Sequence, residues 1–96
     1  MSDSIREFKE SARGFVFVKA KAGREQQIAD KLIGLDEVKE THIIAGEWDV
    51  LGVLEVKREL FDPPQEKILR FVMNRVAKLP SVVDTSTIVP EFSRAK

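Results

Sequence analysis

The sequence predicts one α+β domain in which a four-stranded antiparallel sheet carries two helices on one face. Three observations lead to this prediction. The 96 residues suffice for one small core, and 43% of them are apolar while 33% are charged, as in folded globular domains. Segments of strand character alternate with segments of helical periodicity in the order β-α-β-β-α-β. The two halves of the chain also resemble each other in sequence.

The first strand and the first helix occupy residues 14–34. Residues 14–20, GFVFVKA, are rich in β-branched and aromatic residues, which favour strands. Both faces of this strand are apolar, so we expect it in the middle of the sheet. Residues 23–34 have a glycine at each end, where helix caps belong, and apolar residues at helical spacing, namely Ile28, Leu32 and the following Leu35.

Two strands joined by a short turn follow. Residues 38–44, VKETHII, mix polar and apolar side chains in the manner of an edge strand. Residues 50–56, VLGVLEV, are apolar on both faces, which indicates a second inner strand. The turn between them is AGEWD, residues 45–49, which holds the only Trp of the chain.

Residues 62–64, DPP, mark the start of the second helix. An acid suits the N-cap position, and prolines suit the first helical turn. The helix is expected to end before Pro80, with an apolar stripe made of Ile68, Leu69, Val72, Met73, Val76 and Leu79. Residues 82–89, VVDTSTIV, predict a last strand that is polar enough for an edge, and Pro90 ends it.

An internal repeat supports this arrangement. Residues 35–44, LDEVKETHII, align with residues 79–88, LPSVVDTSTI, so each half is a strand, a helix and a strand. This is the split βαβ, or ferredoxin-like, arrangement, in which right-handed crossovers place both helices on one face. The other face of the two central strands is apolar and has no cover. We therefore expect a homodimer joined through the open sheet faces, an isologous contact.

Composition narrows the functional classes. Sixteen Lys and Arg balance sixteen Asp and Glu, so we expect no direct nucleic-acid partner. There is no Cys, and His42 is the only His, so we expect no metal and no cofactor. No sequence motif of the common hydrolases or nucleotide-binding enzymes occurs, and we expect no catalytic residue. Without a membrane span or a signal-peptide core, a cytoplasmic location is expected.

The turn AGEWD has two interpretations. In the structural one, Gly46 supplies a positive φ, Asp49 accepts backbone N–H bonds, and Trp48 packs on a partner subunit. In the functional one, a carboxylate and an aromatic wall on a rigid hairpin suit a small zwitterionic ligand, whose ammonium needs an acid and whose side chain needs apolar cover. The hydroxyls of residues 85–87 on the last strand are candidates for further polar contacts, for which a neighbouring subunit is needed.

These residues carry a resemblance to a known family. Residues 46–49, GEWD, resemble the G-x-aromatic-D motif of the leucine-responsive and asparagine-sensing regulators, the Lrp/AsnC family. Residues 79–88 resemble its leucine-proline-glycine-valine stretch and the D-T-x-T strand that follows, and residues 15–40 resemble its first strand, helix and second-strand entry. The resemblance covers residues 14–89 and matches only the amino-acid-sensing (RAM) module, without the helix-turn-helix domain.

The resemblance implies a ferredoxin-like module that pairs through its sheets into a dimeric α/β barrel and assembles further, as a tetramer or octamer. It implies an effector-binding domain at residues 14–90, between an N-terminal extension at 1–13 and a C-terminal tail at 91–96. The expected ligand-binding residues are Gly46, Glu47, Trp48, Asp49, Thr85 and Thr87. Two positions depart from the family pattern, since Ser81 stands where Gly is usual and Trp48 where Tyr or Phe is common.

We therefore expect a module that senses an amino acid and passes its occupancy to a partner, a full-length Lrp/AsnC-type regulator, without binding DNA itself. Two alternatives stay open. One is a small dimeric α/β-barrel enzyme of the cofactor-free monooxygenase or isomerase type, with His42, Trp48 and Asp49 as candidate residues. The other is a purely structural assembly subunit.

Overall fold

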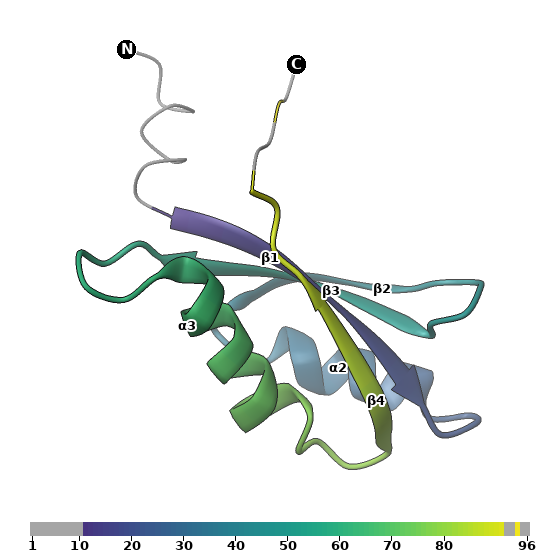
Figure 1. Ribbon diagram of the computed structural model, residues 1–96. Helices are drawn as coiled ribbons and strands as arrows, with labels where there is room; N and C mark the ends of the chain where they lie inside the picture. Colours follow the sequence, from purple (N-terminus) through teal and green to yellow (C-terminus); the bar gives the residue numbers. More distant parts are fainter. Residues whose placement is uncertain (1–10, 92–93, 95–96) are drawn as a thin grey trace.

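Four antiparallel strands form one sheet in the order β2-β3-β1-β4, and two helical elements cover one of its faces (Figure 1). The computed structural model describes residues 11–91 and residue 94, so most of the expected extension and tail lies outside the described residues. The elements are β1 (Ser11–Ala20), α2 (Glu25–Ile33), β2 (Val38–Ile43), β3 (Val50–Lys57), α3 (Pro64–Phe71), η1 (Val72–Val76) and β4 (Val82–Ile88). This confirms the predicted ferredoxin-like fold, with β1 and β3 inside and β2 and β4 at the edges.

The helix-covered face of the two central strands forms the core. On this face Val16 lies opposite Gly52, and Val18 lies opposite Val50. The three valines are fully buried, and the burial of each such side chain contributes about 1.5–3 kcal/mol. The helices complete the core with Ile28, Ala29, Leu32, Ile68, Phe71, Val72 and Val76.

Strand β1 is longer than the sequence pattern predicts. It begins at Ser11 rather than at residue 14, because Ala12 and Arg13 pair with Val56 and Glu55 on β3. Ala12 faces the core at 7% exposure. A single apolar residue followed by Arg carries too little periodic signal for the strand to be extended from sequence alone.

The start of the second helix differs from the prediction. Pro63 occupies the N-cap position, and no side chain caps the helix. The carboxylate of Asp62, which we predicted as the cap, instead accepts two hydrogen bonds from Nη2 of Arg70, at 2.8 and 2.7 Å. The acid is therefore used to tie the preceding loop to the second turn of α3.

The end of the second helix also differs. The π-helical segment η1 continues α3, and the N–H of Ala77 donates to the carbonyl of Val72 at 2.8 Å. Leu69 is 47% exposed and Met73 is 67% exposed. The prediction that they belong to the buried stripe of the helix is therefore wrong. The inward positions are already occupied by other apolar side chains of α3 and η1.

The second face of the sheet has no covering element in the described part of the chain. Phe15, Phe17 and Leu51 are half-buried there, and Val53 is 8% exposed. On β4 this face continues with Ile88, which lies opposite Phe15 and is 51% exposed. The sheet therefore presents the open apolar face that the sequence predicts.

Close packing of α3 on β1 depends on glycine at position 14. A Cβ at Gly14 would lie 2.9 Å from Cδ1 and 3.0 Å from Cγ2 of Ile68, which is fully buried. Gly34, at the C-cap of α2, has φ −77°, and a Cβ there would meet only the carbonyl oxygen of Lys31, at 3.4 Å. An added methyl group would therefore clash with the core at Gly14 but would fit at Gly34.

Gly14→Ala should lower the free energy of unfolding by about 1–3 kcal/mol, because the added methyl overpacks the core. Gly34→Ala is the matched control and should leave the stability unchanged or raise it by about 0.4–1 kcal/mol. Urea unfolding of the three proteins measures both changes. Equal stability of Gly14→Ala and the wild type would mean that α3 can move away from β1 at little cost.

Candidate functional site

The hairpin between β2 and β3 is closed and anchored to the end of β1 by hydrogen bonds to backbone carbonyls. The N–H of Ile44 donates to the carbonyl of Asp49 at 3.0 Å, which closes the hairpin. The N–H of Asp49 donates to the carbonyl of Val18, also at 3.0 Å. Nζ of Lys19 donates to the carbonyl of Glu47 at 2.8 Å. The turn is therefore held on a central strand rather than projecting freely.

The carboxylate of Asp49 has a structural partner. Its Oδ2 accepts a hydrogen bond from the backbone N–H of Ala20 at 2.8 Å, at a half-buried position. A bond between an ionised acid and a backbone N–H is among the stronger hydrogen bonds in proteins. Asp49 thus ties the last residue of β1 to the hairpin.

The other turn residues divide between backbone and surface roles. Gly46 has φ +138°, and a Cβ there would meet nothing within 4 Å, so the backbone conformation rather than crowding favours glycine. Trp48 is half-buried, and its ring packs on Phe17 with centroids 6.3 Å apart and planes inclined by 44°. Glu47 is exposed. The aromatic ring therefore extends the open apolar face, while the exposed side chain of Glu47 lies in the same turn.

The structure separates the two threonines of the last strand from Trp48. Thr85 lies opposite Val18 and Thr87 opposite Val16, so both face the helix-covered side. Ser86 lies opposite Phe17 and shares the open face with Trp48. The hairpin and β4 flank the same end of β1, about 10 Å apart across two strand spacings. A site that combines Trp48 with either threonine requires a second protomer.

His42, the candidate for an enzymatic site, lies on the open face opposite Leu51. Its Nε2 is 3.1 Å from Oε1 of Glu40, and its side chain is 49% exposed. Asp49, the proposed companion, is already bonded to Ala20. Within residues 11–91 and 94, no three His, Asp or Glu side chains are placed to hold a metal ion.

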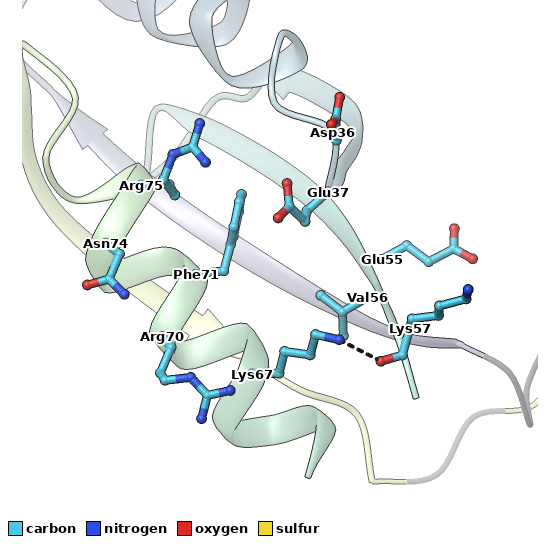
Figure 2. Close-up of a pocket in the computed structure, with 10 residues that line it drawn as sticks. All are labelled: Asp36, Glu37, Glu55, Val56, Lys57, Lys67, Arg70, Phe71, Asn74 and Arg75. Carbon is cyan, nitrogen blue, oxygen red and sulfur yellow. Dashed lines mark hydrogen bonds between the residues drawn. The ribbon is translucent and has the colours of Figure 1, made fainter. Parts of the chain in front are cut away.

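A cleft that sequence reasoning missed lies at the opposite end of β3 from the hairpin (Figure 2). It has a volume of about 440 Å³ and separates the helical segment α3–η1 from the loop before β2. Its walls include Glu37 on one side and Arg75 on the other. In the sequence these charges are interspersed with charges of opposite sign, which is the pattern of an ordinary solvated surface, so no sequence signal marks them.

Known proteins with the same fold were found among solved structures but not by sequence. No family model and no curated protein matches the sequence. Among solved structures, FFRP-DM1 is 25% identical over 82% of this chain and 97% of its own, with a TM-score of 0.68. AsnC of E. coli is 14% identical over 100% of this chain and 60% of its own, with a TM-score of 0.76. The chain has the fold of the RAM domain of AsnC-type regulators.

A third neighbour was solved with an amino acid. The transcriptional regulator NMB0573 of Neisseria meningitidis, in complex with L-Met, is 17% identical over 98% of this chain and 58% of its own, with a TM-score of 0.67. In the described part of the chain, no helix combines the length and the apolar character needed to cross a membrane.

Asp49→Ala should lower the free energy of unfolding by about 1.5–3 kcal/mol in the absence of any ligand, because the N–H of Ala20 loses a charged acceptor. Asp49→Asn keeps a carbonyl acceptor and should lower the free energy of unfolding by a smaller amount. Glu47→Ala, at an exposed side chain of the same turn, should change stability by less than about 0.5 kcal/mol. Chemical denaturation provides the measurement, and wild-type stability of Asp49→Ala would show that this carboxylate is not structural.

Proposed function

We propose that this protein is an amino-acid-sensing and assembly module of the Lrp/AsnC type, which acts in transcription regulation through a partner regulator. The observation that carries the proposal is the RAM-domain fold, shared with AsnC and with NMB0573, a regulator solved with L-Met. In this proposal residues 14–90 form the effector-binding domain, and the protein is cytoplasmic, does not bind DNA itself and has no catalytic activity.

The open face of the sheet supports a homodimer. Aromatic and aliphatic side chains of β1 and β3 occupy its centre, and Trp48 extends it toward the hairpin. Contiguous apolar patches on small proteins mark interaction sites. An isologous contact between two such faces buries the same side chains on both protomers and leaves the helices outside, as in a dimeric α/β barrel. A tetramer or octamer of such dimers completes the proposal.

The hairpin is the proposed ligand site, made of Gly46, Glu47, Trp48 and Asp49, with Thr85 and Thr87 contributed by a neighbouring protomer. Glu47 is exposed, whereas Asp49 is bonded to Ala20. Glu47 is therefore the better partner for the ammonium group of an amino acid, and Trp48 supplies an apolar wall for its side chain.

Ligand binding between protomers gives a signalling mechanism that needs no moving catalytic part. A ligand that binds only the assembled form stabilises that form by mass action, by about 2.7 kcal/mol at one hundred times its dissociation constant. The assembled form then presents a changed surface to a full-length regulator with the same fold. Co-purification of such a regulator with this chain tests the partner, and its absence from repeated pull-downs would contradict mixed assembly.

Light scattering should give a mass of at least twice the 10.9 kDa of the chain at micromolar concentration. Phe15→Asp places a charge in the centre of the open face and should yield a folded monomer, with circular dichroism as the check on folding. Leu69→Asp, on the exposed side of α3, is the matched control and should leave the mass unchanged. A monomeric wild type would contradict the dimer.

A thermal-shift panel of the twenty amino acids should show a rise for one or two of them. Glu47→Gln should remove most of this rise by deleting the charge that faces the ammonium, whereas Glu66→Gln, an exposed acid on α3, should not. Fluorescence of Trp48, the only Trp, reports binding at the hairpin directly. A flat panel with an intact assembly would favour a purely structural subunit.

A further inference from the structure

We infer that the cleft between α3–η1 and the loop before β2 is a separate binding site for a small molecule that carries both an ammonium and a carboxylate group (Figure 2). The inference rests on the charges and walls of the cleft itself and does not depend on the hairpin site.

The cleft has the size and the lining of a small-molecule site. Its volume of about 440 Å³ lies within the usual range of 300–1,000 Å³. The apolar part of the lining comes from Phe71 and Val56, which are 8% and 4% exposed. Figure 2 shows Phe71 between Arg75 on the helical side and Glu37 on the loop side. A ligand across this floor meets a cation at one end and a carboxylate at the other.

The basic residues of the helical side differ in whether they have partners. Arg70 donates to both carboxylate oxygens of Asp62, and this hydrogen bond, followed by the charge of Asp62, raises the pKa of Arg70 above its ordinary value. Lys67 is 2.6 Å from the carboxylate of Glu59. Arg75, by contrast, forms no ion pair within the described residues. It is the guanidinium left for a ligand.

The acidic side is likewise unpaired. Glu37 and Glu55 line the cleft, and neither carboxylate lies within an ion-pair distance of a basic group in the part of the chain that the structure describes. In Figure 2 the carboxylate of Glu37 points toward the floor of the cleft, whereas that of Glu55 points away. Glu37 is therefore the acid that faces Arg75 across the cleft.

Hydrogen bonds to backbone carbonyls hold the walls in place. The N–H of Glu55 donates to the carbonyl of Glu37 at 2.9 Å, which fixes the loop on β3. Nζ of Lys67 donates to the carbonyl of Lys57 at 3.1 Å, which fixes α3 on the end of the same strand. Binding then requires little ordering of the backbone, and the main entropy cost is that of fixing the side chains of Arg75 and Glu37. Arg75 lies on the π-helical turn η1, a distortion that recurs at functional sites.

This arrangement selects a dipolar ligand. A carboxylate forms its strongest pairs with a guanidinium, and an ammonium donates well to a carboxylate. A phosphate would be repelled by the acids on the loop side. A metal ion is disfavoured, because no three acidic or His side chains of the described chain gather around one point. A zwitterion whose carbon chain lies across the face of Phe71 can pair its carboxylate with Arg75 and its ammonium group with Glu37 at the same time.

The test is a titration of the full ¹⁵N-labelled chain, followed by amide chemical shifts. The probes are glycine, β-alanine, 4-aminobutyrate and 5-aminovalerate, in which the separation of the two charges increases stepwise. At least one probe should shift the amides of Glu37, Phe71 and Arg75 while the indole N–H of Trp48 stays in place. Its affinity should fall about tenfold or more in Glu37→Gln and in Arg75→Gln, which each remove one charged partner.

Controls separate a dipolar site from simple charge attraction. Arg24→Gln and Asp30→Asn remove exposed charges that do not line the cleft and should leave the affinity unchanged. Propionate and propylamine carry one charge each and should bind about tenfold more weakly or worse than the matching zwitterion. The two cleft variants lie on opposite walls, so if one fails to fold, the other still decides the question.

Two results would overturn the inference. One is the absence of shifts at the cleft with every probe at tens of millimolar. The other is a set of shifts centred on Trp48 that survives both cleft variants, which would support the proposed function while removing the second site. Conversely, cleft shifts with no response of the hairpin to any of these probes would uphold the inference, and the proposed function is then decided separately by the panel of twenty amino acids.

Discussion

The pairing of β1 with β3 is the constraint on which the rest of the structure depends. Both strands carry apolar side chains on each face, so these side chains are buried only if other protein surface packs on both sides of the sheet. On one side, the helices pack on valines such as Val16 and Val50. Phe15 and Val53 are left on the other side, where no described element covers them. The helix layer, the open face and the proposed dimer all follow from this one pair of strands.

The hairpin combines a structural role with the ligand-binding role that we propose for it. Asp49 is bonded to Ala20 at the end of β1, and its backbone continues the pairing with Val18. Trp48 joins the open face, and the side chain of Glu47 remains exposed. An event at Glu47 or Trp48 therefore acts on a turn that is rigidly connected to a central strand. Such a turn is a suitable place to couple a ligand to an assembly.

The two ends of β3 carry different chemistry. At the Val50 end lies the hairpin, which adjoins the apolar open face. At the Lys57 end lies the cleft, which is on the helix side and is lined by opposite charges. The sheet separates the hairpin's open face from the helix-side cleft, and the two regions share no lining residue, so the two proposed sites are spatially distinct.

Local patterns determined much of this protein. Alternation and composition predict every strand, the central place of β1 and β3, the open apolar face and the positive φ of Gly46, because each depends on neighbours along the chain. Only the tertiary structure decided the rest. It pairs Asp62 with Arg70 instead of the helix end, and it turns Thr85 away from Trp48. These outcomes depend on strand register and packing, since a shift of one residue in register reverses every face of a strand, and no local pattern records it.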